Sequence, residues 1–171
     1  MRIKSGSCWH SCPCLISCRA TCPANCGGPE PEVDDTPAER PSWDEYYLAG
    51  AAWAATRADC TRAQVGAVLV SRDHRVSIGY NGLPAGIPGC ATAGNCPRGQ
   101  MSRSDCAPDS DYANCGANHA EYNAITRARP EDLPGSTLYV TRKPCPRCTT
   151  LIKAAGIARV VTPPSVVRWP A

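Results

Sequence analysis

Two short segments of the chain carry residue types that bind transition metals. A His-x-Glu motif occupies residues 119–121, and a Pro-Cys-x-x-Cys motif occupies residues 144–148. Zinc in a catalytic site binds three nitrogen or sulfur atoms of the protein and keeps a fourth position for water. His119, Cys145 and Cys148 would supply those three atoms. The sequence therefore predicts a catalytic zinc ion, one per chain, at these residues.

Glu121 follows the expected histidine ligand by two residues, which places its carboxylate beside the metal and its water. Bound zinc lowers the pKa of water from about 16 toward 7, so hydroxide becomes available at neutral pH. A carboxylate there can accept the proton of the water and pass protons to the substrate and to the leaving group. A structural zinc closed by a fourth cysteine is the alternative, but such a site would not need this glutamate. We interpret Glu121 as catalytic.

The elements that must position these motifs alternate between helix and strand. Ser42 and Glu45 match a capping box, which predicts a helix over residues 43–58. Residues 65–70 are a nearly continuous β-branched run, typical of a strand buried on both faces. The other predicted elements are strands at 76–80, 137–141 and 157–162 and helices at 119–129 and 146–155, so that each motif starts a helix. The order α-β-β-α-β-α-β predicts an α/β fold with a mixed sheet of four to five strands, parallel in its second half.

The chain divides by composition into three parts. Residues 1–41 are rich in proline and hold six of the 13 cysteines, and we expect a disordered extension there. A metal-binding segment is one alternative, and a reading frame that truly begins at Val33 is another. Residues 42–163 form the expected zinc-dependent domain, and residues 164–171 form a short tail.

Charge and apolar content exclude several classes of protein. The net charge is +3 without a dense basic tract, Phe is absent, and aromatic residues make up only 6% of the chain. Stable nucleic-acid binding is therefore not expected, although a small anionic ligand is compatible with these charges. There is no apolar run long enough to span a bilayer and no signal-peptide pattern, so we expect a cytoplasmic protein without membrane contact. In a reducing compartment, many cysteines indicate metal binding or catalysis rather than disulfides.

Several motifs occur together between about Asp59 and Val161. They read Cys-Thr-Arg-Ala-Gln-Val-Gly-Ala at 60–67, Gly-Tyr-Asn-Gly-Leu-Pro-Ala-Gly at 79–86, His-Ala-Glu-Tyr-Asn-Ala-Ile at 119–125, Pro-Cys-Pro-Arg-Cys at 144–148 and Gly-Ile-Ala-Arg-Val-Val at 156–161. His-x-Glu followed by Pro-Cys-x-x-Cys is the known signature of zinc deaminases. In these motifs the chain resembles the deoxycytidylate (dCMP) deaminase family of the cytidine deaminase-like fold. The resemblance implies a three-layer α-β-α architecture, a homo-oligomer, and hydrolytic deamination of dCMP to dUMP, which supplies the precursor of dTTP.

Other functions stay open beside this one. They are deamination of another cytosine nucleotide, of a modified pyrimidine or of a nucleic-acid base, and a zinc-stapled binding module without turnover. Free cytidine deaminases characteristically have Cys where this chain has His119. The tRNA adenosine deaminases favour a residue other than proline at the position of Pro146 and lack the Gly-Tyr-Asn-Gly segment. These differences favour a pyrimidine deoxynucleotide.

The resemblance also implies contacts with the substrate. Asn81 would face the sugar or the phosphate, and the backbone at Ala67 and Ala120 would contact the base. A plain turn after a strand, where Asn and Gly tolerate positive φ, is the alternative for residues 80–82. Four cations are candidates for binding a 5'-phosphate: Arg62, Arg142, Lys143 and Arg147.

A second set of cysteines matches positions where several relatives carry another zinc: Cys60, Cys90, Cys96 and Cys115. Four thiolates could close a structural site and staple the long segment before His119, and free thiols are the alternative. Cys106 could replace any one of the four. The chain stops nine residues after Thr162, where relatives usually continue, so we expect a shortened C-terminus. A truncated sheet edge and a helix face of small residues both favour an oligomer.

Overall fold

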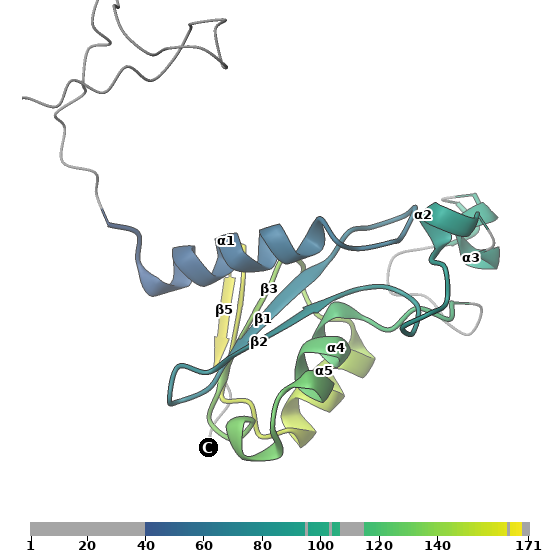
Figure 1. Cartoon of the computed structure of the whole chain (residues 1–171). Helices are drawn as coiled ribbons and strands as arrows, with labels where there is room; N and C mark the ends of the chain where they lie inside the picture. Colours follow the sequence, from purple (N-terminus) through teal and green to yellow (C-terminus); the bar gives the residue numbers. More distant parts are fainter. Residues whose placement is uncertain (1–39, 95, 103, 107–114, 164, 169–171) are drawn as a thin grey trace, which may run out of the picture. The chain divides into compact units, whose positions relative to one another are not determined.

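The computed structural model describes residues 40–94, 96–102, 104–106, 115–163 and 165–168. Apart from residues 40 and 41, the extension predicted for residues 1–41 lies outside the described residues. The described chain builds a central sheet with helices on both of its faces (Figure 1). Among these residues, no helix combines the length and the apolar character that crossing a bilayer requires.

Five strands form the sheet. They are β1 Gly66–Val70, β2 Val76–Tyr80, β3 Thr137–Val140, β4 Arg159–Thr162 and β5 Ser165–Arg168, in the order β2-β1-β3-β4-β5. β3 and β4 pair in parallel, whereas the other neighbouring pairs are antiparallel. A parallel pair needs a crossover connection, and α5 Pro146–Ala154 lies in it. The mixed sheet predicted from the sequence, with parallel pairing in its second half, is confirmed.

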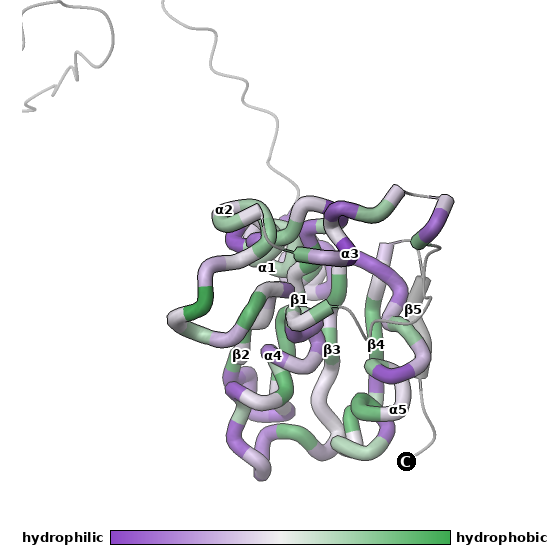
Figure 2. Tube along the Cα trace, turned by 90° about the vertical axis from the view of Figure 1, so that its right-hand side faces the viewer, coloured by the Kyte–Doolittle hydropathy of each residue, from purple (hydrophilic) through white to green (hydrophobic). Residues whose placement is uncertain are grey.

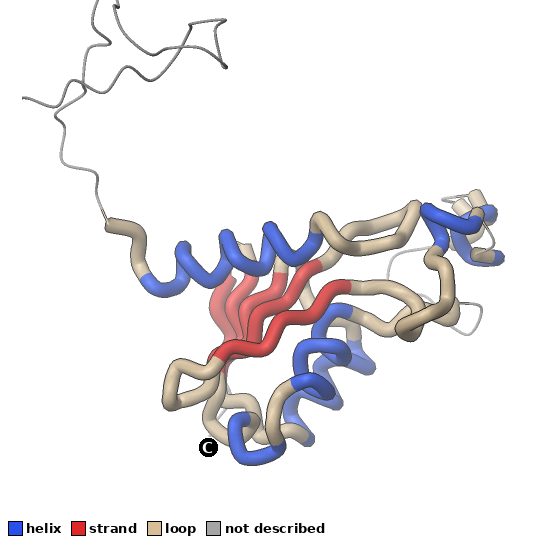
Figure 3. The backbone as a smooth tube through the Cα atoms, viewed as in Figure 1, coloured by secondary structure: helices blue, strands red, loops and turns tan. Residues whose placement is uncertain are grey.

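The helices form the two outer layers. α1 Trp43–Ala55 covers one face of the sheet, and α4 Ala120–Arg127 and α5 cover the other (Figure 3). All five residues of β1 are buried because helices lie over both of its faces. One core cluster joins Leu69 and Leu138 to α4 and α5, and another joins Val68 and Tyr139 to α1. The predicted three-layer α-β-α fold is confirmed.

Two glycines allow the helices to approach the sheet closely. A Cβ atom at Gly66 would lie 1.9 Å from the carbonyl oxygen of Ala51 in α1. A Cβ atom at Gly79 would lie 2.1 Å from the carbonyl oxygen of Ala120 in α4. No side chain fits in either place, so the backbones pack directly on each other. Gly79 therefore sets how closely the start of α4 approaches β2. Because Ala120 directly follows the expected histidine ligand, this approach also places His119.

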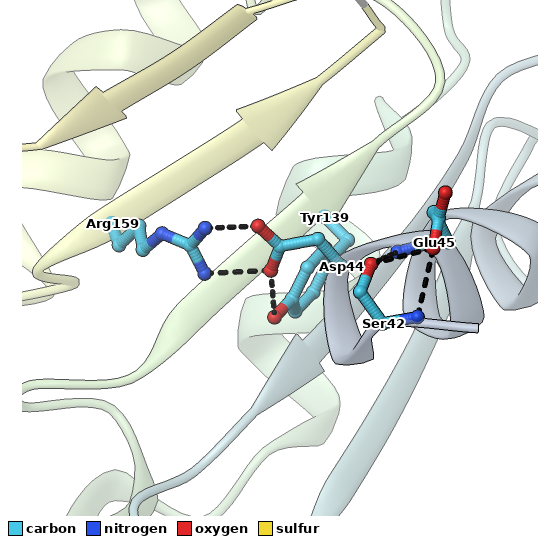
Figure 4. Close-up of polar contacts among 5 residues, drawn as sticks. All are labelled: Ser42, Asp44, Glu45, Tyr139 and Arg159. Carbon is cyan, nitrogen blue, oxygen red and sulfur yellow. Dashed lines mark hydrogen bonds and ion pairs between the residues drawn. The ribbon is translucent and has the colours of Figure 1, made fainter. Parts of the chain in front are cut away.

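The start of α1 is held by two groups of polar contacts (Figure 4). As predicted, Ser42 and Glu45 form a capping box, with Ser42 N–H donating to Glu45 Oε2 over 2.8 Å. Asp44 accepts hydrogen bonds from Arg159 Nη1 over 2.8 Å and from Tyr139 Oη over 3.0 Å. These two hydrogen bonds of Asp44 connect the first turn of α1 to β3 and β4. The helix ends at Ala55, earlier than the predicted residue 58.

Four short elements were not predicted at their positions: two helices, a 3-10 turn and a strand. Between β2 and α4 the chain forms two one-turn helices, α2 Cys90–Ala93 and α3 Pro97–Gln100, which lie together at one end of the sheet (Figure 2). A 3-10 turn, η1 Pro130–Asp132, follows α4. The expected short tail, residues 164–171, contains β5, which pairs antiparallel with β4. The sheet therefore reaches the upper end of the predicted range of four to five strands.

Candidate active site and metal centre

Three metal-binding side chains meet where α4 and α5 begin. The ligand atoms of His119, Cys145 and Cys148 all lie within 4.8 Å of one another. His119 Nδ1 is 3.5 Å from Cys145 Sγ and 3.3 Å from Cys148 Sγ. Tetrahedral zinc, with bonds of about 2.0 Å to nitrogen and about 2.3 Å to sulfur, holds such atoms about 3.6 Å apart. These three residues therefore fit a zinc ion with little movement.

The backbone around the two helix starts explains why these side chains converge. His119 is the N-cap of α4 and Cys145 is the N-cap of α5, and both are in the extended conformation. Cys148 follows in the first turn of α5. The segment before His119 is held by an isolated bridge between Gly82 and Asn118, with hydrogen bonds of 2.9 and 3.1 Å. Helix starts also favour thiolates, because their free N–H groups and partial positive charge stabilise an anion.

The burial of the two cysteines disfavours their thiolate forms unless a cation binds them. Cys145 and Cys148 are each 5% exposed. Desolvation raises the pKa of the Cys148 thiol far above its ordinary value, and the charges of Glu121 and Cys145 raise it further. A coordinated divalent cation reverses this balance, because it deprotonates a thiol outright. The chemistry of the donor set therefore matches a buried zinc site.

Glu121 lies in the first turn of α4 and is buried beside the metal ligands, with 4% of its surface exposed. Burial raises the pKa of its carboxyl group, whereas its own backbone N–H, His119 and Arg142 act in the opposite direction. Its side chain is hydrogen-bonded with Cys148. A buried carboxyl group whose pKa is raised suits a group that takes up and releases protons.

A cavity of about 710 Å³ adjoins these residues. It is lined by His119, Ala120, Glu121 and Cys145, and a volume of this size suits a small-molecule ligand. Among the described residues that line the cavity, Glu121 is the one carboxylate. The cations that line it are Arg62, Arg98, Arg142 and Lys143. This excess of positive charge favours an anionic ligand.

Asn81 lines the cavity, but its carboxamide also bonds to the backbone of the cavity wall. Oδ1 accepts a hydrogen bond from Val65 N–H over 2.7 Å, and Nδ2 donates to the carbonyl of Ala63 over 2.9 Å. The backbone N–H of Asn81 donates to the carbonyl of Val65 over 3.1 Å. Asn81 therefore shapes the wall at residues 63–65, and its predicted contact with the sugar or phosphate stays a prediction.

The two alanines predicted to contact the base lie in different environments. Ala67 is fully buried as the second residue of β1, opposite Gly79 and Val140, and is not among the described residues that line the cavity. Its position in the core therefore does not support the predicted contact. Ala120 is also buried, but it lines the cavity as the first residue of α4. A backbone N–H at that position has no partner within the helix, so contact with a base stays a prediction.

The four cations predicted for phosphate binding also differ in whether they line the cavity. Arg62, Arg142 and Lys143 line the cavity, whereas Arg147 is not among the described residues that do so. The guanidinium of Arg62 bonds to the chain itself: Nε donates to the carbonyl of Arg98 over 2.6 Å, and Nη2 donates to the carbonyl of Met101. Arg62 therefore holds the backbone at residues 98–101, and phosphate binding by any of these cations stays a prediction.

The second predicted set of cysteines gathers around α2 and α3. Side-chain hydrogen bonds link Cys90 to Cys96 and Cys96 to Cys115, and Cys60 acts electrostatically on Cys90 and Cys115. Burial is the main cause that raises the pKa of Cys90 to about 12. We call His119, Cys145 and Cys148 the His119 set. In the described part of the chain, it is the only group with three or more ligand atoms all within 4.8 Å of one another, so the four sulfurs of the second set are more loosely grouped. A zinc ion among them stays a prediction.

Sequence reasoning missed several residues of the cavity wall, among them Arg98 and Thr141. Arg98 is 8% exposed in the structure. The sequence feature that could have indicated it is its position two residues after Cys96, an expected metal ligand. Thr141 Oγ1 accepts a hydrogen bond from Gly66 N–H over 3.1 Å. It directly follows β3 and lies shortly before the Pro-Cys-x-x-Cys motif, but its bond joins residues far apart in the sequence. No local pattern indicates such a bond.

The chain is similar in sequence to several known deoxycytidylate deaminases. The deoxycytidylate deaminase of Mycobacterium phage D29 is 53% identical over 130 residues, which cover 72% of this chain and 96% of the phage protein. The human deoxycytidylate deaminase is 36% identical over 125 residues, covering 70% of this chain and 63% of the human protein. The Schizosaccharomyces pombe deoxycytidylate deaminase is 40% identical over 123 residues, which cover 71% of this chain but 37% of the yeast protein.

A solved structure and a family model extend this similarity. The dCMP deaminase of cyanophage S-TIM5, solved in complex with dCMP and dUMP, superimposes with a TM-score of 0.53 at 27% identity, covering 72% of this chain and 82% of the phage chain. The model of the cytidine and deoxycytidylate deaminase zinc-binding region matches residues 41–163. That range contains the His119 set and Glu121. The chain therefore belongs to the cytidine and deoxycytidylate deaminase family of zinc-dependent hydrolases.

Proposed function

We propose that this chain hydrolyses dCMP to dUMP and ammonia. The observation that carries the proposal is the meeting of His119, Cys145 and Cys148 with the buried Glu121 at one cavity. Cations line that cavity, and they suit a 5'-phosphate, which a free nucleoside lacks. The phage relative named deoxycytidylate deaminase and the cyanophage enzyme solved with dCMP and dUMP support the same substrate.

The side chains of the site divide the chemistry between them. His119, Cys145 and Cys148 would hold zinc, which supplies the Lewis acidity that makes water nucleophilic near neutral pH. Glu121 accepts a proton from the attacking water while a C–O bond forms at C4 of the cytosine ring, and it donates this proton to N3. Glu121 then takes the proton of the hydroxyl group bound to C4 and delivers it to the amino group. The C4–N bond breaks, ammonia leaves, and C4 keeps a carbonyl oxygen.

The burial of Glu121 assists these transfers. Desolvation raises the pKa of its carboxyl group, so that the group holds a proton between the two transfers more readily than an exposed glutamate does. Its 4% exposure also limits exchange of that proton with bulk water. The backbone N–H of Ala120, at the start of α4, would donate a hydrogen bond to the carbonyl oxygen of the base.

A substrate panel tests this proposal. The full chain, with its zinc content measured, would be assayed spectrophotometrically on dCMP, CMP, deoxycytidine and deoxyadenosine. We expect dCMP to have the highest kcat/KM, about 100-fold above deoxycytidine, because a phosphate adds charge-assisted hydrogen bonds. Preference for deoxycytidine or deoxyadenosine would contradict the assignment of the nucleotide. A zinc-loaded chain without turnover on any of the four compounds would contradict the reaction itself.

We also propose a second, structural zinc among Cys60, Cys90, Cys96 and Cys115. The hydrogen bonds that link three of these thiols support it, and a tetrahedral site needs only modest closure of such a group. The zinc would fasten α2 and α3 to the segment before α4. Elemental analysis of the purified chain should find two zinc ions per chain, and a value of one would refute this part of the proposal.

We further propose a cytoplasmic homo-oligomer. All seven described cysteines are free thiols, which suits a reducing compartment. The small-residue face of α1 does not supply the contact expected from the sequence, because Ala51, Ala54 and Ala55 are buried within the chain. The edge strand β2 is a better candidate, since Val76 is 50% exposed and Ile78 is 39% exposed. Light scattering after size-exclusion chromatography tests it, and a monomeric mass would contradict it.

A further inference from the structure

An enzyme that prefers a nucleotide to its nucleoside must hold the phosphate away from the reacting ring carbon. A cation does this best when it is shielded from solvent, because water and salt screen exposed charges. Four cations line the cavity, but they differ in burial. The choice among them rests on the proposed function, that is, on dCMP as the substrate.

Arg98 is the buried member of these four cations. It is 8% exposed and lines the same cavity as His119 and Glu121. It lies within α3, whose N-cap is Cys96. Arg142 and Lys143 are exposed, so solvent and salt weaken their attraction for an anion. Arg142 also acts on Glu121, which puts its charge near the reacting end of the cavity.

The backbone of Arg98 is held from two directions. Its carbonyl accepts a hydrogen bond from Arg62 Nε over 2.6 Å, and the next residue, Gly99, donates its N–H to Cys96 Sγ over 3.3 Å. A Cβ atom on Gly99 would lie 2.8 Å from Thr61 Oγ1, so this turn packs tightly against the segment at residues 60–62. The bonds of Arg62 thus hold the turn in place, and a side chain carried on a fixed backbone loses less entropy when it binds a ligand.

We propose that Arg98 binds the 5'-phosphate and thereby makes the monophosphate preferred over the nucleoside. Its planar guanidinium can donate two parallel hydrogen bonds to phosphate oxygens. The loop cysteines then have a consequence for specificity, because Cys96 caps the turn that carries Arg98. In this arrangement the reaction depends on the His119 set, and the choice of substrate depends on α3.

The test uses the full zinc-loaded chain and its variants Arg98→Gln and Arg98→Lys, with Arg57→Gln as a matched control. Arg57 is an exposed arginine that follows α1. Two quantities would be measured: kcat/KM for dCMP and for deoxycytidine, and calorimetric binding of dUMP and of deoxyuridine, which are not turned over. We expect Arg98→Gln to lower kcat/KM for dCMP about 10- to 100-fold, mainly through KM, and to weaken dUMP binding similarly. Values for deoxycytidine and deoxyuridine should stay within about two-fold.

Arg98→Lys should give an intermediate loss, because a lysine keeps the charge without the fork of donors. The control should behave as the unsubstituted chain. If Arg98→Gln keeps the preference for dCMP, the inference is overturned. It is also overturned if both substrates lose activity equally, since the arginine would then act through the fold alone. Failure of the proposed function is distinct, because the unsubstituted chain itself would then not prefer dCMP.

Discussion

The two sets of cysteines differ in what holds them. In the His119 set, Cys145 and Cys148 belong to the first turn of α5, and His119 caps α4, so elements that pack on the sheet position every ligand. His119 Nδ1 already lies 3.3 and 3.5 Å from the two sulfurs. In the second set, the cysteines come from the segment after α1, from α2, from the N-cap of α3 and from the segment before α4. Their sulfurs are more loosely grouped.

This difference indicates two separate tasks. A site built on a sheet and two helices is preorganised, which catalysis requires because the reacting groups must stay in place without metal-driven rearrangement. A site built on loops becomes ordered mainly by the metal that it binds, because metal binding is coupled to folding. Cys60, Cys96 and Cys115 nevertheless line the same cavity as His119. Changes in the first set should therefore abolish the reaction, whereas changes in the second should alter the cavity wall.

The largest effect should come from the group that moves protons. Glu121→Gln keeps the size of the side chain but removes its ability to take up a proton. We expect kcat for dCMP to fall at least about 1000-fold, with the zinc content unchanged, as measured by steady-state assay and elemental analysis. Glu131→Gln, at an exposed glutamate of η1, is the matched control and should keep full activity. A Glu121→Gln chain with substantial turnover would place the proton carrier elsewhere.

The next largest effect should follow removal of a ligand. His119→Ala leaves two sulfurs without their nitrogen partner, so zinc affinity should fall by at least about 100-fold and activity should fall with it. One zinc ion per chain should remain, held by the second set, when excess metal has been dialysed away. His74→Ala, at an exposed histidine in the turn after β1, is the control. Loss of both ions in the His119→Ala chain would mean that the two sets are not independent.

A smaller effect should follow a change in the second set. Cys96→Ser removes one sulfur and the acceptor of the Gly99 N–H bond, so the chain should lose one zinc ion and α3 should loosen. We expect kcat/KM for dCMP to fall about 10-fold, mostly through KM, and proteolysis between β2 and α4 to become faster. Cys106→Ser, a buried thiol that also lines the cavity, should keep both ions. If Cys106→Ser loses an ion and Cys96→Ser does not, Cys106 is the fourth ligand.

The same contrast explains how far the sequence could predict the structure. The His119 set lies at the starts of α4 and α5, which Pro130 after α4 and Pro146 at the first position of α5 help to place, so its residues and their meeting point were predictable. α2 and α3 are four residues each, too short for any hydrophobic period, and so Arg98 was not found. β5 was missed because a four-residue strand near the end of the chain is defined by its pairing with β4.

Residues whose partners are distant in the sequence were also hard to interpret. The sequence predicted a ligand contact for Asn81 but not the bonds of its carboxamide to Ala63 and Val65, which lie sixteen or more positions earlier. Ala67 lies within a motif of the family, but the sequence did not indicate that it pairs with Gly79 and Val140 and lies outside the described lining of the cavity. The sequence indicates which residues are near the chemistry, whereas the pairing of strands decides which of them reach the cavity.

The smallest effect on activity should come from a polar cluster on the other face of the sheet. Asp44 joins α1 to Arg159 and Tyr139, and α1 covers the face opposite α4 and α5 (Figure 3). Asp44→Asn removes the charge that pairs with Arg159, whose side chain is 23% exposed, and should lower the free energy of unfolding by about 1–3 kcal/mol in urea titrations. Because neither cysteine set touches this cluster, zinc content should be unchanged and kcat/KM should stay within about two-fold. Asp73→Asn, whose pair with Arg75 is exposed, should cost less than about 1 kcal/mol. A large loss of activity in Asp44→Asn at full zinc content would mean that the two faces of the sheet are coupled, and the active site would then depend on α1 as well as on the helices that carry its ligands.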